Sequence, residues 1–323
     1  MYGPNLFTMQ HPAQRTHILL PALLAVLFVF LGLGYDLLTP VFENSDETLH
    51  YPYVKHVADG YGLPIAEPGR LWNQEGTQPP LYYALAAAAT FWLNTDNLPD
   101  LLQRNPHWLF TEVRSLLNDN QNLVLHGPMD AWPYTRAALA VHIGRWVSLL
   151  FGLLTVLLTW RLARILFPDD LPLAATATAL VALTPQFLRV SATVSNDSLS
   201  AALTTLAVLL AYRFTAPERQ ASGPESLWPP FILGLVAGLA VLTKLSSLST
   251  VVLVAFIVFW RRYFLAEIHD APGQKLLRWW AVIGLTVLLV TGWWFFRNYR
   301  LYGEWLATDI HLNLAGRANI SLG

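Results

Sequence analysis

Residues 18–38 read ILLPALLAVLFVFLGLGYDLL, a run in which only Tyr35 and Asp36 carry polar side chains. An α-helix of about 20 apolar residues crosses the roughly 30 Å hydrocarbon core of a bilayer, because each residue adds about 1.5 Å. The run is longer than the apolar region of a signal peptide, and no A-x-A-like cleavage site follows it. We therefore expect a retained membrane-spanning helix near the start of the chain.

The rest of the chain has the composition of a membrane protein. Its 323 residues are 54% hydrophobic and 13% charged, whereas soluble domains are about 25% charged. Six further apolar segments are long enough to be expected as spans: 138–160, 172–190, 197–214, 229–245, 247–260 and 279–296. The sequence thus predicts an all-α fold, a polytopic membrane bundle of about seven transmembrane helices.

Charge and cysteine content exclude several classes of function. Lys and Arg number 20 against 21 Asp and Glu, for a net charge of −1, so there is no basic surface for nucleic acid. Cysteine is absent, which excludes a disulfide framework, a thiolate zinc site and a cysteine nucleophile.

The distribution of the basic residues predicts the orientation in the membrane. With the N-terminus inside, the two short outer loops contain only Lys244. The inner segments contain nine basic residues: Arg15, Arg161, Arg164, Arg213, Arg219, Arg261, Arg262, Lys275 and Arg278. Cytoplasmic loops carry such an excess. The predicted organisation is a cytoplasmic N-terminus (1–17), a first transmembrane helix (18–38), an extracytoplasmic loop (39–136), a six-helix bundle (137–296) and an extracytoplasmic segment (297–323).

The long outer loop is expected to carry structure and function, because unstructured connections of this length are uncommon in compact proteins. Within it, PPLYYALAAAATFWL (79–93) is apolar but too short to span. It predicts an interfacial or re-entrant juxtamembrane helix. A full span here would move the basic loops outside, so the charge distribution argues against it. Small residues in GLVAGLA (234–240) predict close helix packing.

Four titratable residues, Glu43, Asp46, Glu47 and His50, follow the first span within eight positions. One interpretation is a solvated turn in which Ser45 or Asp46 caps a helix over 47–58. The other is a reactive site, in which adjacent carboxylates provide a general base and an orienting or metal-binding partner. Charge alone leaves both open.

Further polar residues fall at the outer ends of the expected spans. Asn196 and Asp197 fit either a turn with an N-cap or a substrate site, and Lys244 fits either snorkelling to the interface or a phosphate contact. Arg297 beside Trp293 and Trp294 fits an interfacial anchor. Arg145 lies inside the second span, where snorkelling is harder, which favours a phosphate or carboxylate partner.

No H-x-x-x-H motif occurs, which argues against a histidine-based zinc site. Carboxylates suit magnesium or manganese, and Asp46, Glu47 and Asp197 are the ligands we would expect for such an ion. The sequence does not decide whether a metal takes part.

The motifs of the outer loop resemble a known family. SDETLHY (45–51), VADGYGLPI (57–65) and QPPLYYAL (78–85) look like the first external loop of the superfamily C (GT-C) glycosyltransferases, in particular bacterial relatives of protein O-mannosyltransferases and aminoarabinose transferases. That family places an acidic pair after its first span, followed by a (H/K/Q)-P-P-L-x-Y element. The resemblance extends over nearly the whole chain through four further elements: GRWVSLLFG (144–152), TPQFLRVSATVSNDSLSAAL (184–203), AGLAVLTKLSSL (237–248) and WWFFRNYRLYGEW (293–305).

The resemblance implies an integral membrane glycosyltransferase, in a bacterial plasma membrane, that moves a sugar from a polyprenyl-phosphate donor to an acceptor on the extracytoplasmic face. Asp46 would be the general base and Glu47 would orient a substrate. Donor and phosphate contacts would come from Arg145, Lys244, Gln78 and His50. Residues that shape the acceptor site or the structure would be Asn196, Asp197, Tyr82 and Arg297.

Two alternatives remain beside this prediction. Family members typically have about eleven to thirteen spans, so a chain with seven is expected to be a minimal form, a C-terminally truncated fragment or an inactive remnant. A transporter or lipid-handling protein is the alternative from another class. Transporters usually show internal repeats and ionisable residues near the bilayer midplane, neither of which we find. The sequence specifies neither the sugar, nor the acceptor, nor the oligomeric state.

Overall fold

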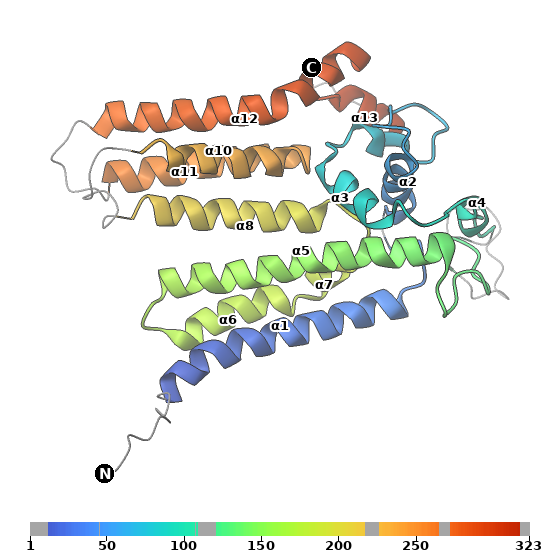
Figure 1. Ribbon diagram of the computed structural model, residues 1–323, viewed down its shortest axis with the longest axis horizontal. Helices are drawn as coiled ribbons and strands as arrows, with labels where there is room; N and C mark the ends of the chain where they lie inside the picture. Colours follow the sequence, from blue (N-terminus) through green and yellow to red (C-terminus); the bar gives the residue numbers. More distant parts are fainter. Residues whose placement is uncertain are drawn as a thin grey trace, which may run out of the picture.

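The computed structural model describes residues 12–44, 46–106, 108, 121–216, 226–264 and 272–316. Every segment expected to span the membrane is helical, and these helices lie side by side with similar axis directions (Figure 1). They are α1 (Pro12–Leu38), α5 (Arg136–Leu166), α6 (Leu171–Ala182) with α7 (Pro185–Ser191), α8 (Asp197–Phe214), α10 (Trp228–Val241), α11 (Leu248–Phe264) and α12 (Pro272–Tyr302).

Three of these helices are long and apolar enough to cross a membrane, over Leu19–Leu38, Arg136–Leu166 and Gly273–Tyr302. The pair α6 and α7 would form a fourth span, broken by a bend of 56°. The bend has a local cause, because Pro185 disfavours helical geometry at the preceding Thr184, which is extended. Helix α10, with 14 residues, is only about 21 Å long. The structure thus gives three or four candidate spans, and the count of seven stays a prediction.

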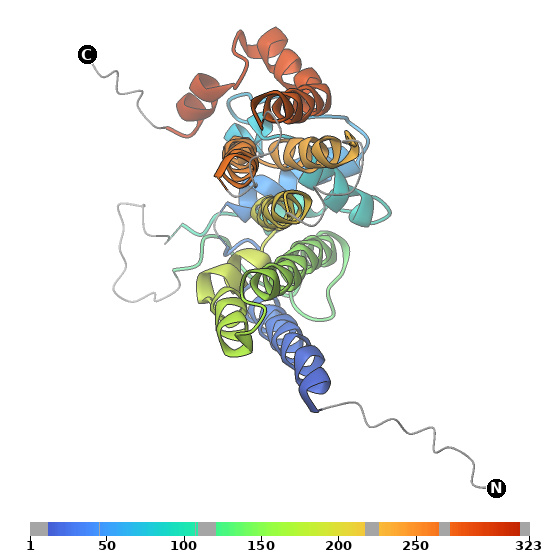
Figure 2. The same ribbon diagram turned by 90° about the vertical axis from the view of Figure 1, so that its left-hand side faces the viewer.

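The helices are arranged as an elongated stack from α1 to α12 when seen nearly end-on (Figure 2). Close contacts within the stack depend on glycine. A Cβ atom on Gly234 would lie 2.7 Å from Cβ of Thr286, and one on Gly238 would lie 2.9 Å from Cβ of Val290. Both neighbours belong to α12, so the close packing expected for GLVAGLA (234–240) is confirmed.

A layer of short elements covers one end of the stack (Figure 1). It contains α2 (Glu47–Ala58), the 3-10 helix η1 (Asn73–Thr77), α3 (Leu81–Thr90), α4 (Leu98–Leu101) and α13 (Thr308–Leu314). The predicted helices over 47–58 and within 79–93 are confirmed as α2 and α3. Because α3 has ten residues, it is about 15 Å long and too short to cross a bilayer.

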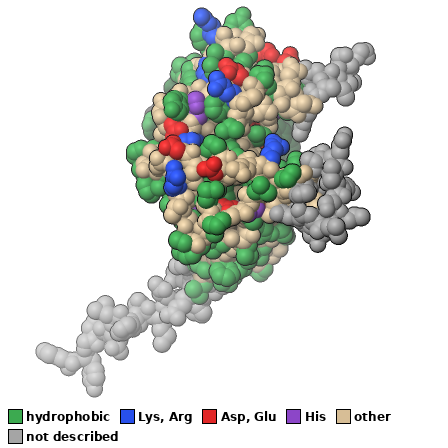
Figure 3. Space-filling model, turned by 90° about the vertical axis from the view of Figure 1, so that its right-hand side faces the viewer, with side chains coloured by type: hydrophobic (Ala, Val, Ile, Leu, Met, Phe, Trp, Pro, Cys, Tyr) green, Lys and Arg blue, Asp and Glu red, His purple; other side chains and the backbone are tan. Residues whose placement is uncertain are grey.

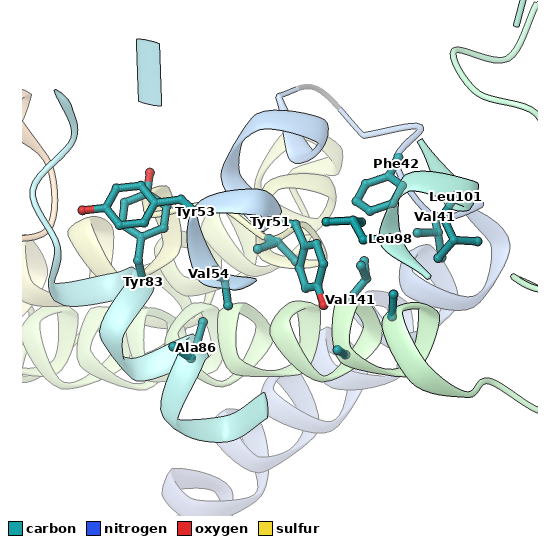
Figure 4. Close-up of a cluster of buried hydrophobic side chains, with 14 of the residues drawn as sticks. Val41, Phe42, Tyr51, Tyr53, Val54, Tyr83, Ala86, Leu98, Leu101 and Val141 are labelled. Atoms are coloured by element: carbon teal, nitrogen blue, oxygen red, sulfur yellow. The ribbon is translucent and has the colours of Figure 1, made fainter. Parts of the chain in front are cut away.

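Helix α2 is seated on α3 and α5 by a hydrophobic core (Figure 4). The rings of Tyr53 and Tyr83 are stacked with centroids 3.7 Å apart and an angle of 2° between their planes. Val54 and Ala86 are fully buried in the same cluster. This core therefore fixes the position of α2 and of the acidic turn that precedes it.

Candidate functional site

Glu47 is fully buried, and its carboxylate accepts four hydrogen bonds. Oε1 accepts from Nε of Arg145 (2.9 Å) and from the backbone N–H of Val194 (3.0 Å). Oε2 accepts from Nη2 of Arg145 (2.7 Å) and from the backbone N–H of Phe42 (3.0 Å). A carboxylate has about four acceptor sites, so none is left for a substrate. Glu47 thus has a structural role, because it connects Arg145, Val194 and Phe42, and this replaces the substrate-orienting role expected from the sequence.

Arg145 is also fully buried. Nη1 donates to the carbonyl oxygens of Asp36 (3.0 Å) and Thr39 (2.8 Å), and Nη2 donates to that of Pro40 (3.0 Å). These carbonyls lie at the C-terminal end of α1, where a cation is favourable. Of the two partners left open by the sequence, a phosphate and a carboxylate, the structure provides the carboxylate of Glu47. Each guanidinium nitrogen is engaged within the protein, so we no longer place Arg145 at the donor phosphate.

Asp36 completes this group. Its carboxylate accepts from Nε1 of Trp146 (2.8 Å) and lies 2.7 Å from Nδ1 of His142 and 3.4 Å from Nη1 of Arg145. We call Asp36, Glu47, His142 and Arg145 the buried cluster. Asp36 was not among the site residues expected from the sequence, although an isolated acid inside an apolar span is a signal for a paired or functional residue.

Asp46, the next-door neighbour of Glu47, has an exposed side chain. Its backbone is left-handed, with φ 60° and ψ 0°, and its side chain makes no capping hydrogen bond to α2. The prediction that the Asp46 side chain caps this helix is therefore wrong. Ser45, the other expected cap, lies outside the described residues. Non-glycine residues at such φ values are uncommon, and they concentrate at functional sites where the surrounding structure enforces them.

Asp46 lines a cavity of about 200 Å³ that we call the acid cavity. Asp197, from the first turn of α8, lines the same cavity together with His50. The remaining lining residues come from α7 and from the turn before α8: Gln186, Arg189, Val190, Thr193 and Ser195. Two carboxylates distant in sequence thus share one cavity with a histidine and an arginine. Sequence analysis did not single out Arg189.

Lys244 forms an ion pair with Asp197, which lines this cavity. The two side chains are 29% and 45% exposed, so both remain accessible to a ligand. Oγ of Ser195 donates to Oδ2 of Asp197 over 3.0 Å and fixes the carboxylate further. Lys244 is therefore held at the site by a carboxylate.

His50 is nearly buried and lies beside a carboxylate that sequence analysis missed. Nδ1 of His50 is 2.7 Å from Oη of Tyr83 and 3.7 Å from Oε2 of Glu75. Burial raises the pKa of Tyr83 well above its usual value, so its hydroxyl stays protonated and pairs with Nδ1 of His50. Oε2 of Glu75 is buried and has no hydrogen-bond partner among the described residues.

Gln78 and Asn196 are paired with each other. Nδ2 of Asn196 donates to Oε1 of Gln78 (3.3 Å) and to the carbonyl oxygen of Thr243 (3.0 Å). Asn196 stands before α8, but its side chain makes no capping hydrogen bond there. The pair links the Q-P-P-L segment to the turn before Lys244.

Tyr82 and Arg297 have structural contacts. Oη of Tyr82 lies 2.7 Å from Oγ of Ser148 and accepts from the backbone N–H of Ser195 (3.1 Å), inside the protein. Nη2 of Arg297 donates to the carbonyl oxygens of Leu63 (3.3 Å) and Pro64 (2.7 Å). Its guanidinium lies 4.9 Å from the centre of the Trp294 ring. These contacts lie within the protein, and the acceptor role considered for both residues stays a prediction.

The carboxylates expected to bind a metal do not converge. Asp46 and Asp197 line one cavity, whereas the oxygens of Glu47 are occupied by Arg145 and backbone N–H groups. Within the part of the chain that the structure describes, no group of three or more His, Asp and Glu residues is arranged to hold an ion. The expected set of Asp46, Glu47 and Asp197 is thus not assembled.

Charged and histidine side chains gather on the end of the molecule that carries the layer of short elements (Figure 3). Basic residues of the opposite end belong to the far turns of the long helices, among them Arg164 of α5 and Arg213 of α8. The acid cavity therefore lies at the end that the sequence analysis assigned to the outside.

Comparisons with known proteins support this architecture. Residues 137–294 match a family model described as dolichyl-phosphate-mannose-protein mannosyltransferase. Among solved structures, the S. cerevisiae protein O-mannosyltransferase Pmt1-Pmt2 complex bound to the sugar donor is similar, with a TM-score of 0.56 and 17% identity. The similarity covers 89% of this chain but 34% of that chain, so this chain spans about a third of its length. At this identity the likeness shows a shared fold. No curated protein matches the sequence.

Proposed function

This chain belongs to the dolichyl-phosphate-mannose-protein mannosyltransferase family, and from that premise we propose that it transfers a sugar from a polyprenyl-phosphate donor to an acceptor hydroxyl. The reaction would take place at the extracytoplasmic surface of the membrane. The matched residues begin after the turn that carries Asp46, so the assignment of the reacting groups rests on the geometry of the acid cavity.

The observation that carries the proposal is the exposed carboxylate of Asp46 in a left-handed backbone at that cavity. As general base, Asp46 takes the proton of the acceptor hydroxyl. The hydroxyl oxygen then forms a bond to the anomeric carbon, the bond from that carbon to the phosphate oxygen breaks, and polyprenyl phosphate leaves. Asp197 lies across the same cavity and is assigned to binding hydroxyl groups of the sugar or the acceptor.

Negative charge grows on the phosphate as the sugar departs, and positive or hydrogen-bonding groups placed there lower the barrier. Lys244 and His50 are the groups that we assign to this role. Gln78 and Asn196 connect the Q-P-P-L segment to the turn beside Lys244, and we assign them to the shape of the donor site.

The orientation is part of the proposal. Arg161, Arg164 and Arg213 lie at the end of the helices opposite the acid cavity. Cytoplasmic ends carry such basic residues. With seven spans, the N-terminus would be cytoplasmic and the cavity would face the outside of a bacterial plasma membrane. A lipid-linked donor suits this place, because its phosphate lies at the membrane surface.

The experiment uses the full chain in lipid vesicles with a polyprenyl-phosphate sugar labelled in the sugar. A detergent extract of cell-envelope glycans serves as the acceptor pool, and a nucleotide sugar serves as the control donor. We expect label in a new glycosidic product, free polyprenyl phosphate in equal amount, and no transfer from the nucleotide sugar. Label that crosses into the vesicle lumen without a glycosidic product would overturn the proposal in favour of a transporter.

A further inference from the structure

A second cavity lies on the other side of the first turn of α2. Its volume is about 200 Å³, equal to that of the acid cavity, and Thr48 and Leu49 of α2 form one of its walls. Arg70, Asn73 and Arg104 are among its polar lining residues. We call it the basic cavity. None of its lining residues belongs to a long helix of the stack.

One wall of the basic cavity is fixed to the turn that carries Asp46. Arg104 and Val124 form an isolated antiparallel bridge, and the backbone N–H of Leu125 donates to the carbonyl oxygen of Gln103 over 2.8 Å. The carboxylate of Glu43 accepts from the backbone N–H groups of Leu123 (2.9 Å) and Val124 (3.1 Å). Glu43 precedes Asp46 by three residues. The turn that contains both residues therefore contacts this wall of the basic cavity through Glu43 and lines the acid cavity through Asp46.

The two cavities differ in charge. The basic cavity is lined by two arginines and by no acidic residue, whereas the acid cavity is lined by two carboxylates. Arg70 donates from Nε to Glu67 over 3.1 Å, and its side chain is 57% exposed, so it remains accessible to a ligand. Guanidinium groups bind carboxylates and phosphates through paired hydrogen bonds. An anion is therefore attracted to the basic cavity.

We propose that the basic cavity binds an anionic group, a carboxylate or a phosphate, of the acceptor whose hydroxyl is presented to Asp46. The inference rests on the proposed function, since it names the class of acceptor for the same site. The occupant is the acceptor rather than the donor, because the cavity is built from the outer layer, away from the helices that would contact a lipid tail. The acceptor would lie across the first turn of α2, which borders both cavities.

Binding is tested first, without any requirement for transfer. Glucuronate and glycerol 3-phosphate are titrated against the full chain in lipid nanodiscs, with glucose as the neutral probe. We expect both anions to bind and glucose to bind more weakly. The double variant Arg70→Gln and Arg104→Gln should weaken anion binding at least tenfold. The relative affinities of the two anions then distinguish a carboxylate from a phosphate.

The matched control is Arg136→Gln, since Arg136 is an exposed arginine at the start of α5 that donates to Asn94 and does not line the cavity. Its anion affinity should equal that of the wild type. Equal anion affinity in the double variant and the wild type, or no anion binding at all, would overturn the inference. A fall in affinity of the same size in the control would overturn it too, because the effect would then be one of overall charge.

Transfer is measured second. With an anionic acceptor, the double variant should raise the acceptor KM about tenfold and leave kcat nearly unchanged, since the arginines do not touch the reacting atoms. An unchanged KM contradicts the inference while leaving the glycosyltransferase proposal intact. Absence of transfer by the wild type contradicts the proposed function, whatever the result of the anion titration.

Discussion

In the buried cluster, four hydrogen bonds saturate the carboxylate of Glu47, and each nitrogen of Arg145 has a partner inside the protein. In the acid cavity, one residue away in the chain, the side chain of Asp46 is exposed and does not cap its own helix. The two regions are connected by the same turn before α2. One carboxylate of the acidic pair is thus committed to the fold, and the other is left accessible.

The difference shows how a strained position is maintained. A left-handed residue other than glycine costs roughly 1–2 kcal/mol. Phe42 and Asp46 both adopt φ values near 60–70°, and Glu47 binds the backbone of Phe42 while Arg145 binds the carbonyls that end α1. The buried cluster holds the turn in the geometry that directs Asp46 into the cavity. The buried acid is therefore a condition for the position of the accessible one.

The largest expected effect comes from breaking the buried cluster. Replacing Glu47 by Gln removes the charge that compensates a fully buried guanidinium, which costs about 3–5 kcal/mol of folding free energy in comparable cases. We expect the Glu47→Gln variant to lose that amount of stability, measured by chemical unfolding of the chain in detergent micelles.

Glu67→Gln is the control for this change, since Glu67 pairs with Arg70 at the surface, where ion pairs contribute about 0–1 kcal/mol. If Glu47→Gln unfolds at the same denaturant concentration as the wild type, then the buried cluster does not stabilise the turn as we describe.

A smaller effect is expected from the cation at the acid cavity. Lys244→Met removes the positive group that we assign to the donor phosphate, and a charge-assisted hydrogen bond contributes about 1.5–3 kcal/mol. Because Lys244 and Asp197 are partly exposed, we expect the lower end, about a tenfold rise in the donor KM, measured by initial transfer rates against donor concentration.

Lys55→Met is the corresponding control, because Lys55 also pairs with a carboxylate, that of Asp59, but this partner does not line the acid cavity, whereas Asp197 does. A donor KM that is unchanged in Lys244→Met, or raised equally in Lys55→Met, would remove Lys244 from the donor site.

The smallest effect concerns pH and the far end of α2. Burial and the neighbouring Arg70 lower the pKa of His56 below its ordinary value. The unfolded chain therefore binds the proton more readily than the folded one. The contribution of neutral His56 to the free energy of unfolding is fully present above the pKa of the unfolded chain, about 6.5. It is lost as the pH falls from there through the lower pKa of the folded protein.

We expect the wild type to lose slightly more stability than the His56→Gln variant between pH 7 and pH 5. Thermal unfolding of both chains across that range measures the difference. Parallel pH dependences of wild type and variant would show that His56 does not contribute.

Much of the fold could be predicted from local sequence patterns. The apolar segments, the helix over 47–58 and the glycine contacts of α10 follow from hydrophobic length, periodicity and small residues, which act within a few turns. The bend between α6 and α7 has a local signal too, because Pro185 disfavours helical geometry at Thr184. The prediction of one continuous span over 172–190 left this signal out. The end of α10 at Val241 could not be predicted in this way, because the next carbonyl oxygen, of Leu242, accepts from the backbone N–H of Leu81, which is distant in sequence.

The candidate site could be predicted only in part. The position of Asp46 and Asp197 at the same end of the stack followed from topology, because both were expected at outer helix ends. Which of Asp46 and Glu47 is buried did not follow from topology. It depends on contacts of Glu47 with Arg145 and with the backbone of Val194, both more than 90 residues away in sequence. Glu75 and Arg189 were missed for the same reason, because only tertiary contacts bring them to His50 and the cavity.

The most direct test of the division between Asp46 and Glu47 is the transfer rate per folded molecule of Asp46→Asn in lipid vesicles. Asp59→Asn serves as the control, since Asp59 is an exposed acid directly after the other end of α2. We predict that Asp46→Asn unfolds like the wild type and transfers sugar at least 100-fold more slowly, as expected for loss of a general base, whereas Asp59→Asn keeps the wild-type rate. A near wild-type transfer rate in Asp46→Asn would contradict the account.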